Sequence, residues 1–200
     1  MLEVSESQAS DFAAAVRNFN ASGWGFQVQG GGDSGDYAFH AKNYADTQVL
    51  FTVRGTGEIT APAMPCFQAR PSTAQNNIST GTATDVAFGT EVFDQGGHFS
   101  GSTFTAPVDG KYQLNFHLYL TGIDDGATYI QIIIKTSNRQ YEFWFDPDGF
   151  DSAPAKWTFS GGHVCDMEAS DTAKIQIRIQ DGAATTDVHG DSTFSGYMVA

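Results

Sequence analysis

The stretch FTAPVDGKYQLNFHLYL, residues Phe104–Leu120, decides the fold. It begins with a bend that contains Pro107 and Gly110, and it continues as a strictly alternating segment. Side chains two residues apart point to the same side of a β-strand. The alternation therefore predicts a long strand with one buried face. The buried face would carry Tyr112, Leu114, Phe116, Leu118 and Leu120, and the other face Gln113, Asn115, His117 and Tyr119.

Further strand-length segments surround this one, and turn residues separate them. In chain order they are CFQAR, DVAFGTEVF, GHFSGSTFTA, KYQLNFHLYLTG, ATYIQIIIKT, QYEFWF, AKWTFSGGHVCDM, TAKIQIRIQ and STFSGYMV. A series of short strands with regular turns is typical of a β-sandwich or a jelly roll. The sequence therefore predicts an all-β fold for residues 63–200.

The first part of the chain, residues 1–62, is predicted to be a separate and smaller β-module. Its strand-like segments are residues 23–32, 36–43 and 48–59, and one face would carry Phe26, Val28, Ala38, His40, Leu50 and Thr52. Residues 1–20 fit either a capped helix or an extended strand, and we favour the strand. The two prolines in residues 60–65 favour an extended connector between the two domains.

Charge and composition exclude several classes of function. The chain has 23 acidic and 10 basic residues, a net charge of −13, which repels nucleic acids and anionic membranes. No apolar run is long enough to span a membrane, and the N-terminus does not have the pattern of a signal peptide. The two cysteines, Cys66 and Cys165, are expected to be a pair of buried thiols.

Three motifs of the second domain, in the same order, resemble the globular domain of the C1q and tumour-necrosis-factor superfamily. They are MPCFQAR (Met64–Arg70), VFDQGGHFSGSTFTAPVDGKYQLNFHLYL (Val92–Leu120) and STFSGYMV (Ser192–Val199). The resemblance implies a jelly-roll sandwich that assembles as a homotrimer. It also implies that part of the face with Gln113, Asn115, His117 and Tyr119 packs near the trimer contact. No collagen-like Gly-X-Y repeat precedes the domain.

The first domain resembles the small β-modules of bacteriophage tail fibres and virion proteins. The similarity lies in the phrase GWGFQVQGGG and in the segment DYAFHAKNYADTQVLFTVRGTGEI. Together the two resemblances imply a bacteriophage structural protein. Two roles fit: a trimeric capsid decoration (cement) protein, and the receptor-binding tip of a tail fibre that recognises a host-surface glycan or protein.

We expect the decoration role, because the chain contains no long fibrous shaft. The first domain would then dock on the major capsid protein, and the second would project from the virion surface. Under the tail-fibre alternative, the acidic loops around Asp124 and Asp187 would be the principal binding elements, and a shaft protein would be the partner.

Several residues suggest chemistry, and each has a structural explanation. Asp146, Asp148 and Asp151 share a short loop that starts like a calcium-binding loop, but Asp and Gly also favour ordinary turns. Trp24, Trp144 and Trp157 suggest sugar-stacking platforms, but their strand positions favour packing in a core or interface. The five histidines lack metal-ligand spacing: His40, His98, His117, His163 and His189.

The sequence contains no motif of an enzyme. Neither G-x-S-x-G nor a phosphate-binding loop is present, and nothing local suggests a paired carboxylate site. We therefore expect no catalytic residues, no cofactor and no dedicated metal site, and we interpret the chain as a structural or binding protein.

Overall fold

The structure is a computed structural model that describes residues 27–200. The chain divides into two compact units, Met1–Ala61 and Pro62–Ala200, and we call the second unit the knob. Residues 1–20, Trp24 and Phe26, for which the sequence makes predictions, lie outside the described residues. Within residues 27–200, no helix is long and apolar enough to cross a membrane.

The described part of the N-terminal unit is a small antiparallel sheet. It consists of β1 (Tyr37–Lys42), β2 (Val49–Arg54) and β3 (Ile59–Thr60), in the order β1-β2-β3. His40 lies opposite Thr52, and their side chains are 3.2 Å apart between Nδ1 and Oγ1. These two residues share a face, as the alternation predicts.

One predicted strand of this unit is wrong. Residues 27–31, the described start of the segment QVQGGG, have no regular secondary structure. Val28 is 42% exposed, so it does not join the buried face with His40 and Thr52. The run of glycines explains the difference, because glycine offers no side chain to pack and loses the most backbone freedom on becoming a strand.

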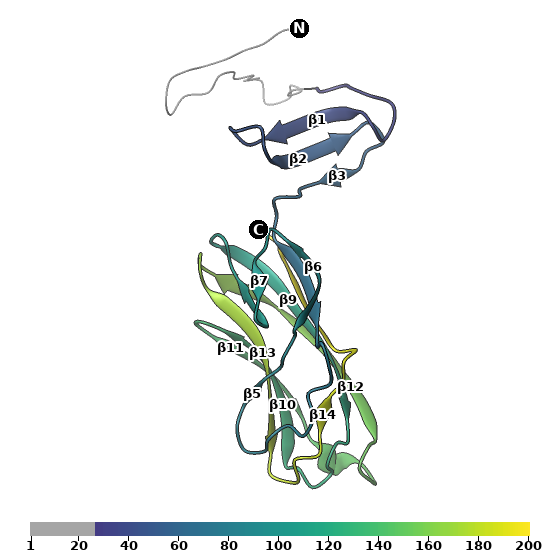
Figure 1. Cartoon of the computed structure of the whole chain (residues 1–200), viewed down its shortest axis with the longest axis vertical. Helices are drawn as coiled ribbons and strands as arrows, with labels where there is room; N and C mark the ends of the chain where they lie inside the picture. The colour runs from purple at the N-terminus through teal and green to yellow at the C-terminus, as the bar shows by residue number, and fades with distance from the viewer. Residues whose placement is uncertain (1–26) are drawn as a thin grey trace, which may run out of the picture. The chain divides into compact units, whose positions relative to one another are not determined.

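One sheet of the knob contains the decisive stretch and has the order β12-β9-β15-β4-β6 (Figure 1). Its strands pair antiparallel, and the short β14 (Asp187–Val188) adds to β9. The five strands are β4 (Cys66–Arg70), β6 (Thr90–Gln95), β9 (Gly110–Thr121), β12 (Lys156–Met167) and β15 (Thr193–Met198).

The opposing sheet has the order β11-β10-β13-β8-β7, and β5 (Thr84–Asp85) pairs with β13. A single turn of 3-10 helix, η1 (Pro147–Gly149), follows β11. The five strands are β7 (Phe99–Ser100), β8 (Thr103–Thr105), β10 (Tyr129–Thr136), β11 (Gln140–Phe145) and β13 (Thr172–Gln180). The knob is thus a two-layer β-sandwich, as predicted.

The segment DVAFGTEVF, predicted as one strand, crosses from one sheet to the other. Thr84–Asp85 belongs to the β13 sheet, and Thr90–Gln95 pairs with β4 in the opposing sheet. Between them Val86 and Phe88 are both buried in the core. A segment that passes between two layers buries alternate side chains as a strand does, so its periodicity resembles that of a strand.

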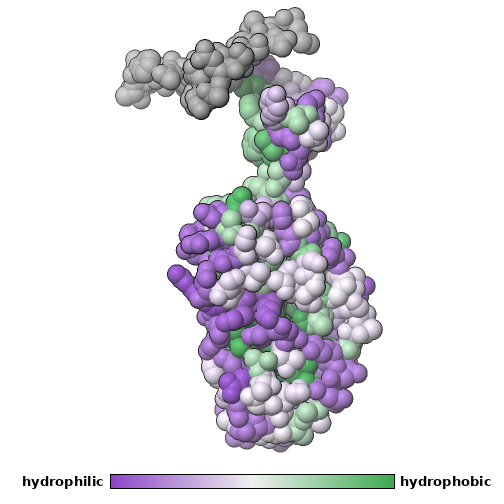
Figure 2. Space-filling model, turned by 60° about the vertical axis from the view of Figure 1, so that its left-hand side comes forward, coloured by the Kyte–Doolittle hydropathy of each residue, from purple (hydrophilic) through white to green (hydrophobic). Residues whose placement is uncertain are grey.

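The core between the sheets confirms the alternation of β9. All five residues of the predicted apolar face are at most 3% exposed: Tyr112, Leu114, Phe116, Leu118 and Leu120. Burial of each such side chain contributes about 1.5–3 kcal/mol. Phe67 packs against the rings of Phe99 and Phe104, with ring centroids 4.9 and 4.8 Å apart. In Figure 2 the visible surface of the knob is mainly hydrophilic, with small separated hydrophobic patches.

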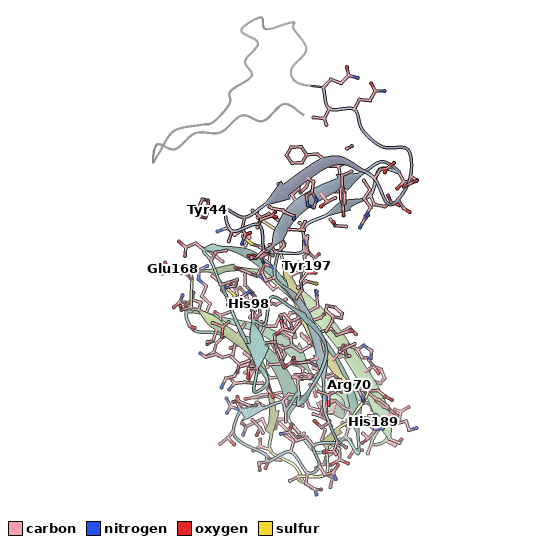
Figure 3. All side chains as sticks on the ribbon, turned by 45° about the horizontal axis from the view of Figure 1, so that its top comes forward. Tyr44, Arg70, His98, Glu168, His189 and Tyr197 are labelled. Atoms are coloured by element: carbon pink, nitrogen blue, oxygen red, sulfur yellow. The ribbon has the colours of Figure 1, made fainter. Side chains whose placement is uncertain are left out.

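Both ends of the knob's chain lie at the same end of the sandwich. The Met198 amide donates to the carbonyl of Pro65 at 3.2 Å, and the Lys111 amide donates to the carbonyl of Ala200 at 2.7 Å. Figure 3 shows Tyr197, Glu168 and His98 near this end, with His189 towards the other. The loops that contain Asp124 and Asp187 therefore lie at the end remote from the chain termini of the knob (Figure 1).

Candidate binding and assembly surfaces

The outward side of the sheet β12-β9-β15-β4-β6 is the first candidate surface, and we call it the assembly face. The strand register aligns two rows of outward side chains across its middle: Gly162, Asn115, Ser195 and Gln68, and then Val164, Gln113, Tyr197 and Cys66. Neither row contains a charged side chain, although the chain as a whole has a net charge of −13. Depletion of charge is characteristic of the centre of a protein–protein interface.

The face of β9 opposite its core face contributes to this surface as the sequence predicts. Gln113 donates from Nε2 to the Asn115 carboxamide oxygen at 2.8 Å, and His117 lies 2.9 Å from the Ser160 hydroxyl. The ring of Tyr119 lies 4.5 Å from that of His189. The side chains are thus held in place before any partner binds. Their position at a trimer contact stays a prediction.

The second candidate surface is the open edge of the sandwich between β11 and β12, which we call the aromatic edge. Its partly exposed rings are those of Tyr141, Phe143, Phe145, Phe150, Trp157 and Phe159. Phe143 packs edge-on against the core residue Phe116 at 4.9 Å, and Phe145 packs against Phe159 at 4.8 Å. Trp157 is 40% exposed, which is a large apolar area to leave in water.

The acidic loop after β11 is used as a turn. The Asp146 carboxylate accepts a hydrogen bond from the Asp148 amide at 3.0 Å and caps η1. In the described part of the chain no three His, Cys, Asp or Glu side chains are grouped so that they could hold a metal ion. Asp151 accordingly does not join Asp146 and Asp148 in one ligand set.

The histidines occupy separate hydrogen-bonded positions. His163 stacks on Tyr141, with ring centroids 4.0 Å apart, and its Nδ1 lies 2.8 Å from the Val164 carbonyl oxygen. His98 lies in the turn after β6, where its amide donates to Asp94 at 3.1 Å. His40, His117 and His189 have the partners already described. The side chains of His40, His117, His163 and His189 therefore have local contacts, and at His98 the contact is made by the backbone amide.

The carboxylate of Asp124 joins the two acidic loops remote from the termini, and that of Asp187 joins the second loop to Asn77. Asp124 accepts from the amides of Gly126, at 3.1 Å, and Ala183. These hydrogen bonds hold the pKa of the Asp124 carboxyl below its usual range. Asp187 accepts from the Asn77 amide at 2.7 Å. Both carboxylates accept hydrogen bonds from backbone amides of the loops, so part of their capacity to accept hydrogen bonds is occupied before any ligand binds.

The cysteines are free thiols, and one of them is less buried than expected. Cys165 is fully buried, and burial raises its pKa to about 11. Cys66 is only half-buried because it points outward on the assembly face. Cys66 on β4 and Cys165 on β12 are three strand spacings apart across the sheet, about 14 Å. A disulfide requires Cα atoms within about 7 Å, so the two thiols are too far apart to form one.

Trp144 corrects part of another expectation. The sequence predicts that it packs in a core or an interface; it is 57% exposed on the outward side of β11, so it is not a core residue of the knob, and its packing in an interface stays a prediction. Its flanking residues Phe143 and Phe145 face inward, and alternation then places Trp144 outward. The neighbouring Tyr129 and Arg178 were not singled out from the sequence. Only the strand register brings them together with Trp144.

Comparison with known proteins agrees with this architecture. The C1q domain family matches residues 67–199, and the chain therefore belongs to the C1q family. C1q domains commonly form trimers, and they are generally binding or structural modules. No curated protein matches the chain.

Two solved structures are similar to part of the chain. The globular domain of zebrafish complement 1qA protein is 20% identical, with a TM-score of 0.47, and the match covers 68% of this chain and 98% of that one. Murine APRIL, in a crystal structure at pH 8.0, is 11% identical, with a TM-score of 0.49. That match covers 68% of this chain and 99% of murine APRIL.

Proposed function

We propose that this chain is a homotrimeric structural protein of a bacteriophage virion, and specifically a capsid decoration protein. The N-terminal unit docks on the shell and the C1q knob projects from it. The observation that carries the proposal is the pair of unpartnered surfaces on the knob, the assembly face and the aromatic edge. Together with the exposed apolar side chains of the described N-terminal sheet, they favour assembly with other copies.

The two surfaces of the knob suit a closed ring. They are chemically different, since the two middle rows of one carry no charged side chain and the other is a row of aromatic rings. A contact between two different surfaces joins the protomers head to tail. Such protomers form a closed ring when a whole number of the rotations between neighbours makes one full turn. In a threefold ring, the aromatic edge of each protomer packs on the assembly face of the next, and no copy is left with an exposed Trp157.

The N-terminal unit supplies the second part of the proposal. Its described sheet has three strands, and its apolar side chains remain exposed: Tyr37 48%, Phe39 45%, Leu50 39%, Phe51 37% and Ile59 66%. The sheet is essentially a two-stranded hairpin with a two-residue third strand, and an isolated hairpin is at best marginally stable in water. Three copies brought together by the knobs, and the shell beneath them, provide a surface for it to pack against.

The net charge of −13 fits a protein displayed in many copies. Like-charged trimers repel one another in solution and on the shell, which favours even spacing over aggregation. Docked trimers would bridge neighbouring capsid subunits and resist the outward pressure of the packaged genome.

The test is immunogold labelling of intact virus particles with antibody raised against the full chain. Gold at many symmetric positions over the head is the expected result, and removal of the protein should then lower the stability of the head. Gold confined to the far end of the tail would replace decoration by the tail-fibre role. Particles without label would overturn the virion assignment.

A further inference from the structure

The outward side of the sheet β11-β10-β13 carries an aromatic platform that has no part in the assembly surfaces. Trp144 on β11 and Tyr129 on β10 meet edge to face, with ring centroids 4.8 Å apart and planes 63° apart. Trp144 is 57% exposed. An indole with one open face, fixed by a second ring, presents a flat apolar surface to the solvent.

A chain of hydrogen bonds holds the platform in place. The Arg178 guanidinium lies over the Tyr129 ring, 5.8 Å from its centroid, and its Nη2 donates to Gln180 at 2.9 Å. Gln180 in turn donates to the Asp181 carboxylate at 2.9 Å. Binding to such a surface requires little further ordering of side chains.

Gln131 lies under the platform and shows how closely it is packed. The register places Gln131 between Trp144 and Arg178 on the same side of the sheet. It is nevertheless only 4% exposed, because the side chains on the adjoining strands cover it. The side chains of the platform are therefore packed together into one surface and are not a set of independent exposed groups.

A polar hollow of about 290 Å³ adjoins the platform where β10 begins and β11 ends. Thr128, Asp146, Asp148 and Asp125 line it. None of these three carboxylates forms a salt bridge among the described residues. Ionised carboxylates accept hydrogen bonds and donate none, so they select a ligand that offers hydroxyl or amine hydrogens and repel an anion.

We propose that the platform and the hollow form a carbohydrate-binding site for neutral glycans. The C–H face of a pyranose ring stacks on Trp144, and its hydroxyl groups donate to the carboxylates of Asp146 and Asp148. A sugar that carries a carboxylate or sulfate is excluded by the charge of the hollow. This activity goes beyond the structural role proposed above, and it uses no residue of the assembly face. The proposal therefore applies both to a capsid decoration protein and to the tip of a tail fibre.

The experiment is binding of the full-length chain to a printed array of neutral, amino and anionic glycans, followed by calorimetric titration of the strongest neutral glycan. Trp144→Ala should weaken that binding about tenfold or more, and Asp148→Ala should weaken it as well. Trp144→Phe should retain part of the affinity. Tyr44→Ala is the matched control, because Tyr44 is fully exposed and lies in the other unit.

Each contrary result overturns the proposal. These are the absence of binding to any glycan on the array, preference for anionic glycans, and Trp144→Ala binding as tightly as the wild type. A fourth is a loss of affinity in Trp144→Ala that accompanies a loss of the oligomer in sedimentation, since Trp144 would then be an assembly contact. Failure here leaves the immunogold result unaffected, so the two proposals are tested separately.

Discussion

The hydroxyl group of Tyr112 donates a hydrogen bond to the carbonyl oxygen of Val108 at 2.7 Å. Tyr112 begins the alternating part of β9, and Val108 lies in the bend that precedes it. The hydrogen bond therefore links the core strand to the bend that precedes it, and the side chain that makes this link is itself fully buried. This contact explains why the bend is followed at a fixed distance by tyrosine and not by another apolar residue.

Tyr112→Phe should lower the free energy of unfolding of the knob by about 1–3 kcal/mol. The substitution removes one hydrogen bond and leaves the Val108 carbonyl without its partner, while the ring still fills the core. Urea denaturation followed by tryptophan fluorescence measures the change. Tyr44→Phe, at an exposed position, should shift the transition by less than about 0.5 kcal/mol. Equal effects of the two substitutions would contradict the role of the Tyr112 hydroxyl.

Gly196 should not tolerate alanine. A Cβ atom at this position would lie 2.7 Å from Leu114 Cδ2 and 2.8 Å from Phe67 Cε1, inside the closed core. Overpacking of this kind typically costs about 1–3 kcal/mol. Gly149→Ala is the matched control, because no atom lies within 4 Å of its Cβ position. Thermal unfolding of both variants provides the comparison. An unchanged melting temperature for Gly196→Ala would show that the core rearranges to accommodate the added methyl group.

The Gly196 contacts also show why the last sequence motif could be recognised but not explained from sequence. The phrase STFSGYMV has the length of a strand and is one of the three motifs that resemble the C1q domain. The reason for glycine is the ring of Phe67, which arrives from β4, more than a hundred residues earlier in the chain. Contacts between residues so far apart in the sequence depend on the topology and register of the strands, and local periodicity does not predict either of them.

The same limit applies to the candidate binding site. Alternation in QYEFWF is sufficient to place Trp144 opposite its neighbours Phe143 and Phe145. The approach of Tyr129 and Arg178 to Trp144 follows only from the antiparallel register of three strands. The acidic loop was noticed in the sequence as a possible calcium loop, whereas its position beside an aromatic platform became visible only in the fold.

The two thiols should differ in reactivity. Burial raises the pKa of Cys165 to about 11 and also raises the pKa of Cys66, but Cys66 is half-exposed. At pH 8 a thiol reagent should modify Cys66 slowly and leave Cys165 unmodified until the knob unfolds, because the thiolate is the reactive form. Mass spectrometry of the native and urea-unfolded protein measures both. Rapid modification of Cys165 in the native protein would show that the core opens there.

Acid should weaken the contact between β5 and β13. Burial alone would raise the pKa of Asp85, but hydrogen bonds from Lys174 and Gln176 and the Lys174 charge outweigh it, and the pKa is lowered. The stabilisation is therefore present above the unfolded-state pKa of about 3.9 and is lost as the pH falls through the lower folded-state value. The pair is partly exposed, so its contribution is below about 1 kcal/mol.

The measurement for Asp85 is the free energy of unfolding of wild type and Asp85→Asn between pH 7 and pH 2. The variant should be less stable at pH 7, and the difference should shrink below pH 4. A difference that stays constant across the series would show that the charge of Asp85 is not responsible.

Assembly can be tested with two valines of nearly equal exposure. Val164 is 47% exposed and lies on the assembly face beside Gln113, whereas Val108 is 48% exposed and lies outside that face, in the bend before β9. Arginine at position 164 would place a long charged side chain in an uncharged contact, where desolvation is unfavourable. Val164→Arg should therefore shift the protein from trimer to monomer in sedimentation velocity, and Val108→Arg should remain trimeric. A monomeric wild type would refute the proposed ring, and a trimeric Val164→Arg would place the protomer contact on a different surface.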